Sequence, residues 1–117
     1  MTIQRIKPGA RMSGAVVHGD TVYLAGQVAD KTAGGSVTEQ TREILSIIDG
    51  LLAEAGTDKS RLLSCQVFLK DIRDVDGMNR AWDAWLDRSN PPARATVEAK
   101  LVDPRWAVEI TAIAALP

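Results

Sequence analysis

Two ionisable residues stand in strand-like segments near the C-terminus, where a charge needs an explanation. Arg94 opens the alternating stretch "ARATVEAKL" directly after two prolines, and Glu109 lies in the middle of "AVEITAIAA". A guanidinium fork can hold a carboxylate, and a carboxylate can orient a water molecule and accept its proton. Together they suggest a site that holds a small carboxylic acid and directs water at it. Taken singly, each is more simply interpreted as a solvated strand residue, or, for Glu109, as an ion-pair partner of Lys100 or Arg94.

The histidine and the cysteine indicate structure rather than chemistry. His18 lies in "VVHGDTVY", where His-Gly-Asp between two apolar runs predicts a hairpin turn and not a catalytic base. Cys65 shares a strand face with Leu63, Val67 and Leu69, which is typical of a core thiol. One His and one Cys cannot supply a His-rich zinc site, so we expect no metal.

Three further residues carry weaker signals. Trp82 and Trp85 stand at helical spacing, which favours the core or an interface over a base-stacking platform. Gly26 in "AGQV" falls short of a nucleotide-binding fingerprint. Its backbone N–H is nevertheless free of side-chain bulk and could contact a ligand.

Length and composition indicate an ordinary globular protein. The chain has 117 residues, of which 45% are apolar and 25% charged, and 14 basic residues face 15 acidic ones. We therefore predict a single domain spanning residues 1–117, with no electrostatic footprint for nucleic acid or a membrane surface. No apolar window is long enough to cross a membrane, the first residues lack the apolar core of a signal peptide, and a lone cysteine fits a reducing compartment. These features predict a cytoplasmic protein.

The elements that position the candidate residues follow from hydrophobic periodicity. Residues 11–17 and 21–25 predict a hairpin, and a capping box of Ser36 and Glu39 begins a helix that Gly56 ends. A strand over 62–70, a helix over 78–86, and strands over 94–101 and 106–114 follow.

This ββαβαββ order predicts one mixed sheet with two helices on one face, which is a two-layer α+β sandwich. Both faces of the last strand are substantially apolar, with Val108, Ile110, Ala112 and Ala114 on one of them. Because two helices can cover only one face of the sheet, we expect another subunit to cover the other.

Four segments together resemble one known family. "GDTVYLAGQVA", "FLKDIRDVDGMNRAWDAWL", "PPARATVEAKL" and "VEITAIAAL" stand in the order and approximate spacing of the YjgF/RidA family, also named endoribonuclease L-PSP. The P-x-R-x-x-V-x-A-x-L segment with its V-E-I-x-x-I-A ending is the most specific part, and the resemblance covers nearly the whole chain. The short N-terminal segment and the "AWDAWL" helix look most similar to the YoaB-like branch.

The resemblance implies a chorismate-mutase-like fold assembled as a homotrimer around a barrel-like centre, with ligand clefts between subunits. It implies cofactor-independent hydrolysis of reactive 2-imino and 2-enamino acids, such as 2-iminobutanoate and 2-iminopropanoate, to 2-keto acids and ammonia. Carried over to this sequence, Arg94 would grip the substrate carboxylate and Glu109 would position the attacking water. Gly26 and Ala25 would line the cleft, and Asn79 would match a recurrent helix asparagine of structural value.

Departures from the family pattern keep alternatives open. Ala25 stands where serine is common, Thr96 where cysteine is frequent, and the usual tyrosine near the first strand has no counterpart. A non-catalytic module of the same fold that binds small carboxylates or keto acids is therefore the alternative function. Ribonuclease action or translation inhibition is a third, and near-zero net charge without basic–aromatic interleaving argues against it.

Overall fold

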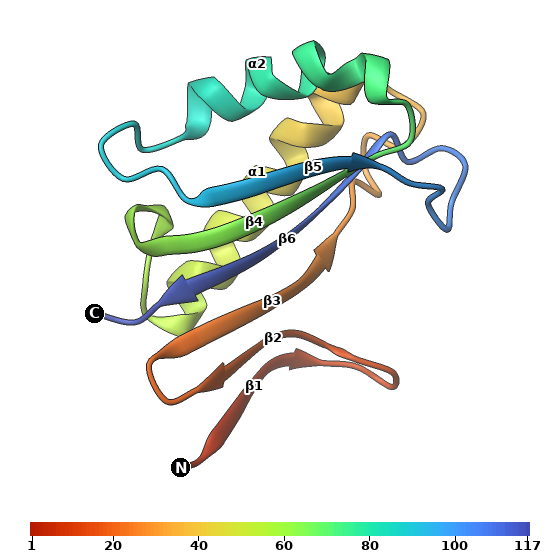
Figure 1. Ribbon diagram of the computed structural model, residues 1–117. Coiled ribbons are helices and arrows are strands. Elements are labelled where there is room, and N and C mark those ends of the chain that lie inside the picture. Colours follow the sequence, from red (N-terminus) through yellow and green to blue (C-terminus); the bar gives the residue numbers. More distant parts are fainter.

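Six strands form one sheet with two helices on one side of it (Figure 1). The computed structural model describes residues 1–117. In chain order the elements are β1 (Ile3–Pro8), β2 (Ser13–His18), β3 (Thr21–Gln27), α1 (Val37–Ala55), β4 (Leu62–Leu69), α2 (Val75–Trp85), β5 (Ala93–Glu98) and β6 (Val108–Ala115). The spatial order is β1-β2-β3-β6-β4-β5, and only the β4–β5 pair is parallel. The predicted mixed sheet with two helices is confirmed.

The first helix begins and ends where its caps predict. The Ser36 hydroxyl accepts a hydrogen bond from the Glu39 N–H, and Gly56 follows the helix with φ of 91°, in the left-handed region that glycine adopts freely. The apolar stripe of α1 is buried against the sheet and includes Ile44, Leu45, Ile48, Leu51 and Leu52. Local sequence signals therefore suffice to place this helix.

The edge strand β1 was not predicted. Only Ile6 of its six residues is buried, so the alternation that marks a half-buried strand is absent. Backbone pairing with β2 holds the segment in place, from Ile3 opposite His18 to Pro8 opposite Ser13. A strand stabilised mainly by its ladder leaves little trace in the pattern of side chains.

One predicted core residue is exposed. Cys65, Val67 and Leu69 of β4 are buried as expected, but Leu63 is 51% exposed and Leu62 is buried in its place. The pairing of β4 with β6 shifts between Leu62 and Ser64, which breaks strict alternation at that point. The prediction for Leu63 was therefore wrong, because alternation cannot reveal an irregularity in register.

A buried glutamine joins α1 to the segment that leads into β6. Gln40 is fully buried, and its Nε2 donates to the carbonyls of Gly35 (3.1 Å) and Arg105 (3.0 Å). Its Oε1 accepts from the N–H of Ala107 at 2.8 Å. These three bonds satisfy backbone groups that no strand partner reaches, and they fix where β6 enters the sheet.

No helix of the chain combines the length and the apolar character that crossing a membrane requires.

Gln40→Met should lower the free energy of unfolding by about 3 kcal/mol, because it removes three hydrogen bonds between a buried side chain and the backbone, each contributing about 1 kcal/mol. Chemical denaturation checks this value. Gln4→Met, on the exposed edge strand, should change the free energy of unfolding by less than about 0.5 kcal/mol. A loss below about 1 kcal/mol for Gln40→Met would show that the three bonds do not hold this segment.

Candidate functional site

Arg94 projects from the edge strand toward the helical layer. It pairs with Cys65 in the parallel β4–β5 ladder, and Cys65 points into the core beneath the helices. The Arg94 Cζ lies over the Trp82 ring, 5.0 Å from its centroid, and Nη1 lies 3.9 Å from the Met78 sulfur. The residue as a whole remains exposed. Its guanidinium is thus fixed against α2 and open to solvent.

No carboxylate of the chain neutralises Arg94. The ion pairs in the structure are Arg73–Asp71 and Arg105–Asp103, each between residues two apart in a turn. The Arg94 side chain instead contacts a weak sulfur acceptor and an aromatic face. The solvated strand-end interpretation does not account for such contacts.

Glu109 lies on the opposite face of the sheet. Its neighbours Val108 and Ile110 are fully buried toward the helices, so the half-buried Glu109 side chain points to the open face. The carboxylate lies directly against Gly26 of β3. A Cβ on that glycine would stand 2.1 Å from the Glu109 Oε2. Only glycine leaves room for the carboxylate in this position.

A β-bulge explains why Gly26 and Glu109 meet. Leu24 pairs with Ala112 and Gln27 with Ile110, so β3 holds one more residue than β6 across this stretch. The extra length falls at Ala25 and Gly26. The Ala25 carbonyl accepts a hydrogen bond from the Gln27 side-chain Nε2 at 2.9 Å. The methyl side chain of Ala25 supplies no hydrogen-bond donor. The structure therefore brings Ala25, Gly26 and Glu109 to one place.

Arg94 and Glu109 of one chain do not converge. Arg94 is level with Cys65 of β4 and Glu109 with Phe68, and β4 separates their two strands. The offset is roughly 10 Å across the sheet and roughly 10 Å along it, from the usual strand spacing and rise. The two side chains also point to opposite faces. A small acid cannot contact both residues of the same protomer.

Thr96 is a polar group near Arg94 for which the sequence interpretation found no role. It pairs with Val67, which faces the core, so its side chain lies on the same side of β5 as Arg94. The Thr96 Oγ1 is buried and has no hydrogen-bond partner. The sequence alone could have placed Thr96 beside Arg94, since residues two apart in a strand share a face.

The remaining sequence candidates take structural positions. Cys65 is buried, and burial raises the pKa of its thiol to about 11, an effect that the nearby Arg94 guanidinium only partly offsets. His18 ends β2 at the predicted hairpin, where Gly19 has φ of 61°. Asn79 is half-buried on α2 next to Met78. No group of three His, Cys, Asp or Glu side chains is placed to hold a metal ion.

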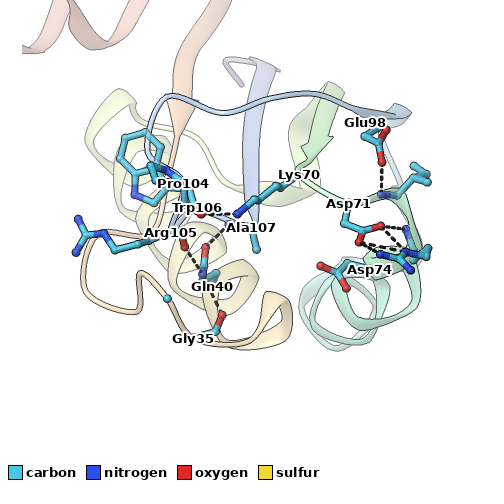
Figure 2. Close-up of a pocket in the computed structure, with 13 residues that line it drawn as sticks. Gly35, Gln40, Lys70, Asp71, Asp74, Glu98, Pro104, Arg105, Trp106 and Ala107 are labelled. Atoms are coloured by element: carbon cyan, nitrogen blue, oxygen red, sulfur yellow. Dashed lines mark hydrogen bonds and ion pairs between the residues drawn. The ribbon is translucent and has the colours of Figure 1, made fainter.

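The largest depression, about 840 Å³, lies at the end of the sheet where β4 and β5 finish (Figure 2). Several of its polar groups have partners within the chain, although the buried Trp106 Nε1 has none. Asp71 binds Arg73 at 2.7 Å, and hydrogen bonds from that residue hold the pKa of Asp71 at about 2. Lys70 donates to the carbonyl of Pro104 at 2.6 Å, and Glu98 accepts from the N–H of Ile72. Most of these contacts tie one turn to another, so the depression is held together by bonds within the chain.

The sequence matches known proteins along nearly its whole length. The family model described as Endoribonuclease L-PSP matches residues 2–116. A RutC family protein of Haemophilus influenzae is 53% identical over 114 residues, covering 97% of this chain and 98% of that protein. The RutC family protein YoaB of Escherichia coli is 40% identical over 116 residues, covering 99% and 100%.

Solved structures show the same fold. The crystal structure of a YjgF family member from Neisseria meningitidis superposes with a TM-score of 0.96 at 38% identity, covering 100% of this chain and 97% of that one. The resemblance drawn from the four sequence segments is thereby confirmed. The chain belongs to the Endoribonuclease L-PSP family, together with the RutC and YjgF proteins that it matches over nearly its whole length.

Proposed function

We propose that this protein hydrolyses reactive 2-imino and 2-enamino acids to 2-keto acids and ammonia. The observation that carries the proposal is the unneutralised guanidinium of Arg94, fixed against α2 on the edge strand. An arginine held without a carboxylate of its own chain is suited to receive the carboxylate of a ligand. A planar 2-imino acid can be gripped there while its C2 stays open to water.

The proposed site needs two copies of the chain, which we assign to a homotrimer. The open face of the sheet presents apolar side chains to solvent, among them Tyr23 (47% exposed) and Val97 (39% exposed). Such a face favours burial against another copy. A neighbouring copy that lies against the β5 edge brings its own Glu109 toward Arg94. The opposite faces on which the two residues lie then become the two walls of one cleft.

The chemistry requires little beyond orientation and one base. Arg94 holds the substrate carboxylate, and the Glu109 carboxylate accepts a proton from water as the water oxygen bonds to C2. The electron pair of the C=N bond moves to nitrogen. Glu109 returns the proton to that nitrogen, which gives a carbinolamine. It then takes the hydroxyl proton and passes it to the amino group, so that the C–N bond breaks, ammonia leaves and the C2 carbonyl forms. An enamino acid enters this sequence after a proton moves from its nitrogen to C3, which gives the imine. Every atom and proton is supplied by substrate, water and Glu109, and no cofactor takes part.

Ribonuclease action, which the family description names, finds less support in the structure. Single-stranded RNA is bound by exposed aromatic side chains on which bases stack and by several cations that contact phosphates. Here Trp82 is 5% exposed and already lies beneath Arg94. The Trp85 indole donates to Asp49 at 2.9 Å. The geometry therefore favours a single small carboxylate over a nucleic acid chain.

Arg94→Ala should lower kcat/KM for 2-aminoacrylate about a hundredfold, through loss of charge-assisted bonds to the carboxylate. Glu109→Gln should lower kcat by ~10² or more while binding of the stable product analogue 2-ketobutyrate is kept. The assay generates 2-aminoacrylate enzymatically and follows its decay. Saturable 2-ketobutyrate binding without faster decay by the wild type would replace the proposal with a non-catalytic binding module.

Mixing the two inactive variants should restore activity if each site draws Arg94 from one copy and Glu109 from the next. In randomly mixed equimolar trimers of Arg94→Ala and Glu109→Gln, about one quarter of the sites hold both intact residues. We therefore expect about a quarter of wild-type activity after the variants are unfolded and refolded together. Wild type refolded in the same way is the control. A mixture no more active than the two separate variants would overturn a site shared between copies.

Gly26→Ala should lower kcat about tenfold, because the new methyl group forces the Glu109 carboxylate out of its position. The cost to folding should stay below about 1 kcal/mol, since only the end of a flexible side chain has to move. Gly50→Ala, which meets nothing within 4 Å, is the matched control. If Gly26→Ala lowers kcat by the same tenfold in a Glu109→Gln background, the glycine does not act through Glu109.

A further inference from the structure

We infer that Trp82 is a positioning residue for this site, one that holds the Arg94 guanidinium in place without neutralising it. The inference rests on the proposed function for the identity of the ligand, a small carboxylate. It concerns a residue that composition and spacing assigned only to the core or to an interface.

The contact between the two residues has the geometry of a cation over an aromatic face. The Arg94 Cζ lies 5.0 Å from the centroid of the Trp82 ring. The negative face of an indole attracts a cation without accepting a conventional hydrogen bond from it, whereas a carboxylate partner would occupy the guanidinium fork. The one hydrogen bond of the guanidinium runs from Nη1 to the Met78 sulfur at 3.9 Å, which is a weak acceptor. The donors that a carboxylate needs stay available.

Trp82 is itself held from behind. Its ring packs against Trp85 with centroids 5.7 Å apart and planes at 54°. The Trp85 indole N–H donates to Asp49 of α1 at 2.9 Å, and the Lys59 ammonium lies 5.1 Å from the centroid of the Trp85 ring. Contacts between α1 and α2 therefore set the position of the ring on which Arg94 rests.

A fixed guanidinium has a direct consequence for binding. An arginine side chain loses conformational entropy about several rotatable bonds when it binds a ligand. A side chain that is already ordered avoids most of that cost. Removing the aromatic face should therefore weaken carboxylate binding even though Arg94, its charge and its donors remain.

The test measures 2-ketobutyrate binding by isothermal titration and the Arg94 Nε–Hε resonance by NMR, assigned with Arg94→Lys. In the wild type, the ring current of Trp82 should displace this resonance from the position of a solvated arginine. Trp82→Leu should return the resonance to that position and raise the Kd for 2-ketobutyrate about tenfold. Trp82→Phe, which keeps a smaller aromatic face, should raise the Kd about two- to threefold and move the resonance part of the way.

Leu51→Ala is the control for lost stability, because Leu51 is buried on α1 next to Gly14 of β2, far from β5. It should leave both the Kd and the resonance unchanged. If Trp82→Leu does not fold, the Kd for 2-ketobutyrate and the Arg94 resonance of Trp82→Phe test the inference. An unchanged Kd in the Trp82 variants, or a wild-type resonance at the solvated position, overturns the inference.

The two proposals fail in different ways. Normal 2-ketobutyrate binding without hydrolysis of 2-aminoacrylate by the wild type overturns the proposed function and leaves the role of Trp82 standing. Loss of binding in Trp82→Leu with hydrolysis intact in the wild type supports both. Failure of the wild type to bind 2-ketobutyrate overturns both, since Arg94 then has no carboxylate to receive.

Discussion

The register of β6 is the constraint on which the rest of this structure depends. The strand lies between β3 and β4 and is antiparallel to both, so its pairing is specified on two sides. Its even-numbered residues fill the core beneath the helices, which forces Glu109 onto the open face. A slip of one residue would bury Glu109 and expose Ile110, at a cost that a domain of this size could not bear. Gln40 reinforces this register by binding the N–H of Ala107, one residue before the strand begins.

Arg94 carries a charge that no ion pair compensates, and its contacts with α2 fix where that charge lies. The acidic residues of two turns are paired locally, Asp71 with Arg73 and Asp103 with Arg105. Arg94 lies apart from both turns and is held by an aromatic ring and a sulfur atom, which stabilise its position and leave its charge uncompensated. An unpaired but ordered charge is of little use for stability and well suited to binding an anion.

The placement of Arg94 and Glu109 on opposite faces links the site to the oligomeric state. Within one sheet, alternation and the intervening strand keep the two side chains apart. Contact with a second copy is the simplest way for both to reach one ligand, and the apolar side chains on the open face supply a physical reason for that contact. Catalysis would then require assembly, because a monomer would hold the ligand carboxylate at Arg94 with no base near C2 of the ligand.

Local patterns in the sequence determined much of this protein. The capping residues and stripe of α1, the hairpin at Gly19, the two faces of β6 and the mixed sheet under two helices all follow from periodicities of a few residues. Strand β1 could not be predicted because backbone pairing holds it and its side chains show no such period. The exposure of Leu63 could not be predicted because a shift in register also leaves no periodic pattern. The tertiary structure alone decided that β3 bulges at Gly26 to admit the Glu109 carboxylate, that Arg94 rests on Trp82, and that Arg94 and Glu109 face away from each other. These are relations between residues far apart in the chain, and they depend on which strands pair and in what register, which no local pattern specifies.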